Sequence, residues 1–557
     1  MRSFPSGDKF VFRLNRRLLG CAAACVLSAP ALAHADDLQR ASRPADTQTS
    51  AAESAPVATA SAESGSVLGR LVDDYTHEWG KAGPDADPNA PPGRRDDFPP
   101  QPVTQPPYPF TEWPYGAASS LGATRPNSVD SPLMAAIAPT SLGQALQKAH
   151  IQVYGWVDVG GNLSTNHVEG GNAPAAYDYN PNTIQLDQAV IYVERLPDTV
   201  QRDHIDWGFR VSGIYGTDYR YTTSYGLWSN QLLKQNRAYG YDAPMIYGEL
   251  YIPQVAKGLM IRAGRFISIP DIEAQLAPNN YMYSHSMTYT FDNYTNTGVL
   301  ATLAVTKNLF VQFGVTNGTD TFIGNNGEKV ANPYPNVLYP GSTFRKDPGA
   351  KPSYSACVRY QSDSARDNVY VCANGINNGQ WGYNNLQWYG FTYYHKFIDK
   401  FHVAFETYNV HENGVPNLNN PDVQVILANG GTPFSGGRTR YNAPGAALCA
   451  SATSLTCTAN VQAELAYWNY QLSPLDNISL RTEYFDDMQG QRTGVATSYE
   501  DVALGLQHWL SPQIELRPEI AYYRSNDAKA FGGNGNHGLP PNRDQSVILS
   551  GDAIFHF

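Results

Sequence analysis

The feature that most constrains the fold is a period of two in the apolar residues, which continues from residue 150 to residue 557. In "IDWGFRVSGIY", large apolar side chains alternate with small or polar ones. The segments "NISLRTEYF" and "QIELRPEIAYY" repeat the pattern, with charged residues between bulky apolar ones. Successive side chains of a β-strand point to opposite faces of the sheet. The alternation therefore predicts strands whose two faces meet opposite environments.

About 16 such segments can be placed, and the connections between them alternate in length, as in bacterial outer-membrane barrels. Connections such as "PQVA", "TKN" and "LSPQ" are short, whereas the alternate connections are long. A soluble sandwich would not need this alternation, and a propeller would show repeat motifs. We place the strands near 150–162, 183–195, 205–218, 244–253, 257–267, 293–305, 308–318, 352–362, 367–375, 385–396, 400–412, 460–473, 476–487, 498–510, 512–524 and 546–557.

The predicted fold class is all-β, a transmembrane antiparallel β-barrel of about 16 strands. No run of about 18 apolar residues offers a transmembrane helix. Because lipid cannot satisfy exposed backbone groups, a spanning sheet must close on itself, and a barrel of this width leaves an aqueous channel. The net charge of −11 argues against nucleic acid as a partner. The candidates for aromatic girdles at the lipid headgroups are Trp156, Trp207, Tyr393, Trp468 and Trp509.

The N-terminal region differs from the barrel in composition. Residues 1–35 combine a basic start, a short apolar stretch and Ala33-His34-Ala35 before Asp36, which is typical of a secretory signal peptide. Residues 36–149 are rich in Ala and Pro and predict a disordered, flexible periplasmic extension. A lumen plug is the alternative for this stretch. The predicted organisation is thus a signal peptide (1–35), an extension (36–149) and a barrel (150–557).

The connection after the fifth strand, "RFISIPDIEAQLAPNNYMYSHSMTYTFDNYTNTG", is the third long loop. In general porins the third long loop folds into the barrel and narrows it. We therefore predict a pore constriction that includes Asp271, Glu273, Tyr281 and Tyr283, in which the two carboxylates focus the electric field on passing ions. The alternative is that Asp271 caps a short helix and Glu273 lies on its exposed face.

Four arginines, Arg210, Arg262, Arg481 and Arg517, alternate with apolar residues on their strands. Arginine on the lipid face near the bilayer centre costs about 2–4 kcal/mol, so these side chains are expected to point into the lumen. They could form a basic ladder opposite the carboxylates of the constriction, or simple lumen salt bridges with Glu483, Glu515 or Glu519.

Four cysteines remain after signal cleavage, and they form two pairs that are local in sequence. In an exported chain this arrangement predicts two disulfide bonds. Cys357 and Cys372 fall symmetrically about a short turn, so both are expected to point inward and opposite one another. Cys449 and Cys457 are expected to close a small loop within a long extracellular connection.

The sequence shows no convergent nucleophile and base, so the chain is expected not to be an enzyme. Histidines such as His402 and His508 are scattered singly on strands. No C-x-x-C or H-E-x-x-H spacing is present, and we expect neither a metal nor a cofactor. Two alternatives stay open: an outer-membrane enzyme, and a plugged or gated receptor barrel.

From about residue 110 onward the chain resembles the OmpL-like group of β-barrel porins. The resemblance is carried by "EWPYGA", by "QVYGWVDVGGNLSTN", by the long connection quoted above and by the terminal strand. It implies an outer-membrane channel for small hydrophilic solutes in a Gram-negative bacterium. It implies no catalytic residue. General porins of this size are often trimers, so a homotrimer is an open alternative.

The last strand, "SVILSGDAIFHF", places Phe555 and Phe557 on its apolar face. A C-terminal aromatic residue on such a strand resembles the signal that the bacterial barrel-assembly machinery recognises. We therefore expect this strand to be an assembly signal and to pair with the first strand near "IQVYGWVDVG". The predicted partners are outer-membrane lipid, small hydrophilic solutes and the assembly machinery.

Overall fold

A computed structural model describes most of the chain from residue 131 onward and one earlier helix. The described residues are 65–77, 131–175, 177–224, 226–233, 235, 237–267, 271–292, 295–323, 329–330, 344–345, 352–364, 366–378, 385–428, 446–511, 513–533 and 539–557. The predicted signal peptide and most of the predicted extension lie outside these residues, and they remain predictions.

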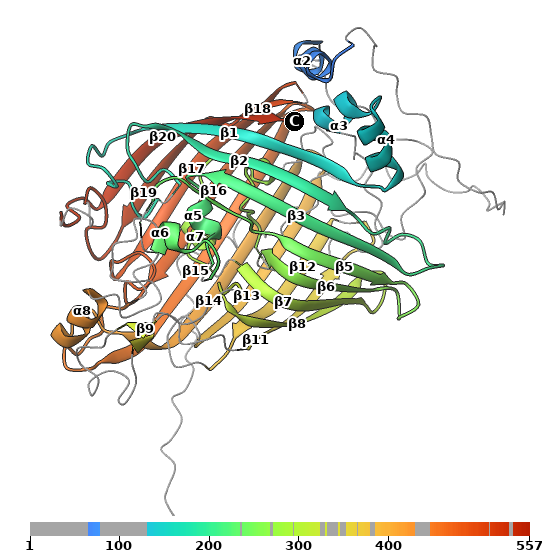
Figure 1. Cartoon of the computed structure of the whole chain (residues 1–557). Coiled ribbons are helices and arrows are strands. Elements are labelled where there is room, and N and C mark those ends of the chain that lie inside the picture. Colours follow the sequence, from blue (N-terminus) through green and yellow to red (C-terminus); the bar gives the residue numbers. More distant parts are fainter. Residues whose placement is uncertain are drawn as a thin grey trace, which may run out of the picture. The chain divides into compact units, whose positions relative to one another are not determined.

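The strands of the described chain form one closed antiparallel barrel with 16 membrane-spanning strands (Figure 1). Two of these strands are interrupted, β4 with β5 and β18 with β19. The strands are β1 (Gln152–Ser164), β2 (Ile184–Arg195), β3 (Asp206–Gly216), β4 (Gly240–Asp242) with β5 (Ile246–Ile252), β6 (Leu259–Ile267), β7 (Thr295–Ala304), β8 (Leu309–Thr319), β11 (Ser353–Gln361), β12 (Asp367–Ile376), β13 (Leu386–Ile398), β14 (Phe401–Pro416), β15 (Thr456–Ser473), β16 (Asp476–Asp487), β17 (Thr497–Ser511), β18 (Ile514–Leu516) with β19 (Glu519–Ser525), and β20 (Gln545–His556).

The barrel closes where β1 pairs with β20, in a register that runs from Trp156 opposite His556 to Ser164 opposite Ile548. One further pair extends this ladder, because Gly155 and Phe557 exchange both main-chain hydrogen bonds at 2.9 Å. The first and last strands of the barrel are therefore neighbours, as the sequence predicts. Closure leaves no edge strand exposed to lipid.

Proline accounts for the two interruptions. Pro244 lies between β4 and β5, and Pro518 lies between β18 and β19. Proline has no N–H to donate to the ladder, so the hydrogen-bonded pairing stops there. The pieces on both sides of each proline still pair with the same neighbouring strand, β3 in the first case and β17 in the second.

The predicted alternation of faces is confirmed along β3. Trp207 and Val211 are 53% and 45% exposed on the outside, whereas Arg210 and Ser212 are 1% exposed on the inside. The prediction that Trp156 and Trp509 belong to the aromatic girdles is wrong, because they are 0% and 1% exposed. Trp156 donates a hydrogen bond to Gln188 at 3.1 Å, and Trp509 stacks on His556, both on the inward face. An indole ring suits a lumen with hydrogen-bond acceptors as well as a headgroup region.

The connections alternate between short turns and long loops, so the long loops share one end of the barrel. This is the end that faces outward in bacterial outer-membrane barrels. The long loops contain short helices and one small two-stranded sheet, several of which lie within the outline of the strands in Figure 1. These elements are α5 (Tyr219–Thr222), α6 (Asn230–Leu233), the 3-10 helix η2 (Ala277–Asn279), α7 (Met287–Thr290), α8 (Pro421–Ala428) and the strands β9 (Lys329–Val330) and β10 (Phe344–Arg345).

Among the described residues, three helices precede the barrel: α2 (Val67–His77), α3 (Pro132–Ile137) and α4 (Ser141–Lys148). The hydroxyl of Ser131 caps α3 by accepting from the amide of Met134 at 3.2 Å, and it donates to the carbonyl of Val153 at 3.0 Å. The helix is thereby fixed to the start of β1. None of the helices that the structure describes is long and apolar enough to cross a membrane.

Candidate functional site

The segment between β6 and β7, described over residues 271–292 and called loop 3 from here on, lies inside the barrel. Every described residue of loop 3 is buried except Ala274, which is half-buried. Its polar groups bind inward-facing side chains of β14, β15, β16, β19 and β2. Loop 3 therefore starts at one wall of the barrel and reaches strands far around its circumference.

The two ends of loop 3 are fixed to β14 and β16. Glu406 of β14 accepts from the amide of Ile272 at 2.8 Å, and Tyr408 donates to the carbonyl of Thr288 at 2.6 Å. Glu483 of β16 accepts from the amide of Met287 at 3.0 Å, near the start of α7. Its carboxylate also accepts from the amide and the hydroxyl of Thr288. These carboxylates satisfy backbone donors that would otherwise be buried without partners.

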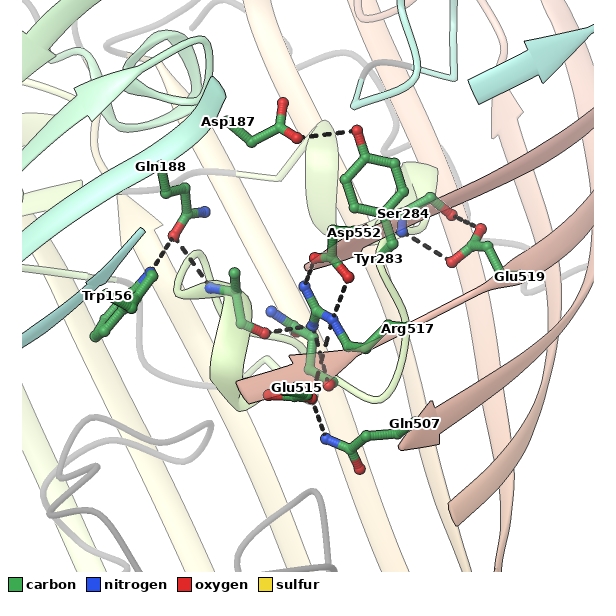
Figure 2. Close-up of polar contacts among 12 residues, drawn as sticks. Trp156, Asp187, Gln188, Tyr283, Ser284, Gln507, Glu515, Arg517, Glu519 and Asp552 are labelled. Atoms are coloured by element: carbon green, nitrogen blue, oxygen red, sulfur yellow. Dashed lines mark hydrogen bonds and ion pairs between the residues drawn. The ribbon is translucent and has the colours of Figure 1, made fainter. Parts of the chain in front are cut away.

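Ser284, in the middle of loop 3, is held between two charged side chains of the wall. Glu519 of β19 accepts from its amide at 2.9 Å and from its hydroxyl at 2.5 Å. Arg481 of β16 donates to its carbonyl at 3.0 Å and contacts its hydroxyl at 3.1 Å. Figure 2 shows Ser284 with its two bonds to Glu519. Charge-assisted hydrogen bonds of this kind are about twice as strong as neutral ones.

Arg517, in the gap between β18 and β19, connects loop 3 to β20. It forms an ion pair with Asp552 and donates to the main-chain carbonyls of Ala277 and Asn280 (Figure 2). Glu515, two residues earlier, accepts from Gln507 at 2.5 Å. The Pro518 break therefore places a guanidinium where it binds both the wall and the loop.

The tip of loop 3 reaches β1 and β2. The hydroxyl of Tyr283 donates to Asp187 of β2 at 3.1 Å. The ring of Tyr283 occupies the space where a Cβ on Gly160 of β1 would lie, so this position requires glycine. Gln188 adds a second contact, because its side chain bonds both the carbonyl of Gln275 at 2.8 Å and the amide of Ala277 at 3.2 Å.

The structure places the predicted constriction residues in these contacts. Glu273 accepts from Ser286 and from the hydroxyl of Tyr467 on β15, and Tyr281 shares a hydrogen bond with His402 on β14. Burial raises the pKa of Glu273 above its usual value. Burial, followed by the nearby charge of Glu406, raises the pKa of Asp271 well above its usual value. Both carboxyl groups thus lie at contacts between the loop and the wall.

All four predicted lumen arginines are buried inside the barrel, and each pairs with a carboxylate on a neighbouring strand or strand segment. The partners differ from those that the sequence suggested, because ladder register, and not sequence proximity, brings the charges together. Glu515 does lie 4.0 Å from Arg517, but the closer partner is Asp552. The pairs are Arg210 with Glu194, Arg262 with Glu249, Arg481 with Asp501, and Arg517 with Asp552.

Arg265, at the end of β6, is a lumen arginine that the sequence pattern did not indicate. Its guanidinium binds Asp242 at 2.8 Å and donates to the carbonyl of Thr222 at 2.6 Å, so it fixes the loop that contains α5. Strict alternation from Arg262 would point Arg265 outward. Gly264 has φ +138°, a region that favours glycine, and both arginines are buried. Gly264, between the two arginines, was the feature of the sequence that could have indicated this break in the alternation.

Several carboxylates surround the tip of loop 3. Three of them are buried inside the barrel: Asp158 of β1, Asp187 of β2 and Asp218, just after β3. Asp158 also lies near enough to Asp552 for their charges to interact. The charge of Arg517 acts on Asp158 but is already paired with Asp552, and the charge of Arg220 acts on Asp218. This part of the lumen therefore has a surplus of carboxyl groups.

The structure contains both disulfide bonds, Cys357–Cys372 and Cys449–Cys457. Cys357 and Cys372 are directly opposite in the ladder of β11 and β12, and both are buried. Cys457 lies at the second residue of β15, because β14 and β15 extend beyond the predicted boundary. This bond therefore joins the long connection to the end of a strand.

Phe555 and Phe557 were predicted to share the outward face of the last strand. Phe555 is 39% exposed, on the outward face of β20, and Phe557 is half-buried beside Gly155. Their function as an assembly signal remains a prediction.

The family model described as "Putative beta-barrel porin-2, OmpL-like" matches residues 150–557 of this chain. A comparison with curated protein sequences gives no significant match. Among solved structures, the anion-selective porin from Comamonas acidovorans is 9% identical, with a TM-score of 0.42 over 73% of this chain and 99% of that chain. The outer membrane channel DcaP of Acinetobacter baumannii is 10% identical, with a TM-score of 0.41 over 73% and 97%. The trimer form of the outer membrane protein OmpT of Vibrio cholerae is 10% identical, with a TM-score of 0.39 over 73% and 99%.

Proposed function

Because the chain belongs to the family of OmpL-like β-barrel porins, we propose that it allows passive diffusion of small hydrophilic solutes and ions across the outer membrane, with loop 3 as the constriction of the channel. The observation that carries this proposal is the position of loop 3, which is bonded to the inner wall from β14 around to β2. A buried loop with this many wall contacts reduces the cross-section available to solutes and fixes it.

The proposed constriction includes Asp271, Glu273, Tyr281 and Tyr283. Each has a distinct position: Asp271 and Glu273 lie toward the start of loop 3, Tyr281 lies at β14, and Tyr283 lies at β2. Hydrogen bonds to β14 on one side and to β2 on another hold the loop in one conformation. This favours a pore of constant width over one that a mobile loop opens and closes.

The chain is proposed to act as a channel and not as an enzyme. Among the buried histidines of the lumen, His402 attaches loop 3 to β14 through Tyr281, His285 bonds the carbonyl of Ala274 at 2.8 Å within the loop, and His556 stacks on Trp509. Burial lowers the pKa of His285 to about 3, so this imidazole stays neutral at physiological pH.

The environment and assembly of the channel follow from the same proposal. We place it in the outer membrane of a Gram-negative bacterium, with lipid around the apolar outer face of the barrel. Recognition of Phe555 and Phe557 by the barrel-assembly machinery is part of the proposal, and so is association into a homotrimer.

The experiment that tests channel function is planar-bilayer conductance of the refolded mature protein. We expect discrete open-channel currents that scale with KCl concentration, because a water-filled lumen conducts as a bulk electrolyte. Heat-denatured protein at the same concentration is the control. Absence of channel currents from folded protein would contradict the proposal.

We predict that the channel prefers cations, because carboxylates outnumber guanidinium groups around the tip of loop 3. In Asp187→Asn, the ratio of K⁺ to Cl⁻ permeability should fall on the order of tenfold, because a unit charge about 12 Å from a passing ion contributes roughly 1.4 kcal/mol at an effective dielectric constant of about 20. The reversal potential in a KCl gradient measures this ratio. An unchanged reversal potential would assign the selectivity to other residues.

The variant Asp271→Asn/Glu273→Gln tests the assignment that the sequence suggested for these two carboxylates. If they focus the field on passing ions, their removal also lowers the cation preference in the same measurement. If the ratio of K⁺ to Cl⁻ permeability did not change, the function of these two carboxylates would be to attach loop 3 to the wall.

A further inference from the structure

Three carboxylates from distant parts of the chain converge at the base of loop 3. Asp271 is the first described residue of loop 3, Asp292 is the last, and Glu406 projects inward from β14. One oxygen from each carboxylate lies within 4.8 Å of the other two. The three residues are only 4%, 5% and 1% exposed. In the part of the chain that the structure describes, this is the one group of His, Cys, Asp and Glu with such convergence.

Two oxygens of this cluster are buried and lack a hydrogen-bond donor. They are Oδ1 of Asp271 and Oε1 of Glu406, which belong to different elements. The other oxygen of Glu406 accepts from the amide of Ile272 at 2.8 Å, and this bond orients the carboxylate. A buried carboxylate oxygen without a partner raises the free energy of the folded state, unless a proton or a cation is bound there.

Among the described residues, the positive charge of Arg492 near the cluster is already paired. Arg492 forms an ion pair with Glu412, and its charge also reaches Asp292. Glu273 adds a further negative charge near Asp271.

We propose that Asp271, Asp292 and Glu406 bind one divalent cation, with Ca²⁺ as the best fit, and that this ion ties both ends of loop 3 to β14. The ligand atoms are all carboxylate oxygens. Hard cations such as Ca²⁺ prefer oxygen ligands, whereas softer metals prefer nitrogen or sulfur. Two oxygens bound to the same Ca²⁺ at about 2.4 Å can be at most about 4.8 Å apart, as these are. Bidentate carboxylates and water complete the six to eight ligands that Ca²⁺ takes.

Ca²⁺ suits this site better than Mg²⁺ for two reasons. Mg²⁺ needs a nearly regular octahedron and gives up its water reluctantly, whereas Ca²⁺ accepts irregular sets of carboxylates. The cluster is also almost completely buried, which limits the water that a bound Mg²⁺ could keep. The sequence offered no signal for this site, because its members are up to 135 residues apart and follow no motif spacing.

The test is Ca²⁺ binding to the full chain, refolded in detergent and stripped with EDTA. Equilibrium dialysis against CaCl₂ should give one bound Ca²⁺ per wild-type chain. In Asp271→Asn and in Glu406→Gln the affinity should fall at least tenfold, because each loses one charged ligand. Glu273→Gln is the matched control, since Glu273 is a buried carboxylate of the same loop that bonds Ser286 and Tyr467. It should lose much less affinity than either ligand variant, because Glu273 adds charge near Asp271 without being a ligand.

A second measurement needs no variant. The melting temperature of the wild-type barrel should increase with CaCl₂ concentration, because a ligand that binds only the folded state stabilises it. The same concentrations of MgCl₂ should increase it less. The proposal is overturned if the wild-type chain binds no Ca²⁺, if Glu406→Gln binds it with unchanged affinity, or if Glu273→Gln loses it equally. Binding does not depend on permeation, so this result stands apart from the conductance experiment.

Discussion

An Arg481→Leu variant is expected to lose about 3–5 kcal/mol of the free energy of unfolding and to conduct larger currents than the wild-type channel. Arg481 and Asp501 are both fully buried and bonded to one another, so the substitution leaves a buried carboxylate without its counter-charge. It also removes both bonds from Arg481 to Ser284 of loop 3. Urea unfolding in lipid vesicles measures the first effect, and single-channel recording measures the second.

Two controls separate the charge effect from the loop effect. The double variant Arg481→Leu/Asp501→Leu leaves neither charge unpaired, so it should regain much of the stability while its conductance stays high. Arg262→Leu breaks the buried pair with Glu249, which joins β6 to β5, and should destabilise the barrel without a change in conductance. Equal stability of the single and double Arg481 variants would show that the pairing with Asp501 contributes little.

A Gly155→Ala variant is expected to prevent closure of the barrel between β1 and β20. A Cβ at this position would overlap the carbonyl oxygen of Val190 and would lie 2.7 Å from Cζ of Phe557. Because Gly155 exchanges both main-chain bonds with Phe557, the last pair of the closing ladder would be lost. We expect little folded protein in the outer membrane, as measured by the heat-dependent mobility of the barrel on gels.

Gly213→Ala is the matched control for this prediction. Gly213 also lies in a spanning strand, but a Cβ there would meet Cγ2 of Ile191 at 3.7 Å, which is ordinary contact. This variant should fold as the wild type does. If Gly155→Ala assembled normally, the pairing of β1 with β20 would tolerate a shift of Phe557. Gly155 would then not be required for closure of the barrel.

Sequence periodicity predicted the strands well, because the two faces of a membrane barrel impose opposite chemistry on successive residues. Arg210 and Val211 illustrate this, since one is buried in the lumen and the other faces outward. The same reasoning failed for Trp156 and Trp509. Tryptophan is amphipathic, so its presence on a strand does not show which face it occupies.

The candidate site was predicted only in outline. The third long loop could be identified from its position in the chain, and Asp271, Glu273, Tyr281 and Tyr283 do belong to it. Their partners could not be identified, because those contacts join residues that are about a hundred or more positions apart, such as Tyr283 with Asp187 and Ile272 with Glu406. Only closure of the barrel brings these strands within reach of the loop.

The sequence by itself determined the class of fold, the order of the strands and the face on which most charges lie, since all three follow from short-range alternation and from the cost of exposing polar groups to lipid. Tertiary structure alone decided which carboxylate pairs with which arginine, how loop 3 is attached across the lumen, and that Asp271, Asp292 and Glu406 meet. Pairing register and loop docking are long-range, and only the closed barrel sets them.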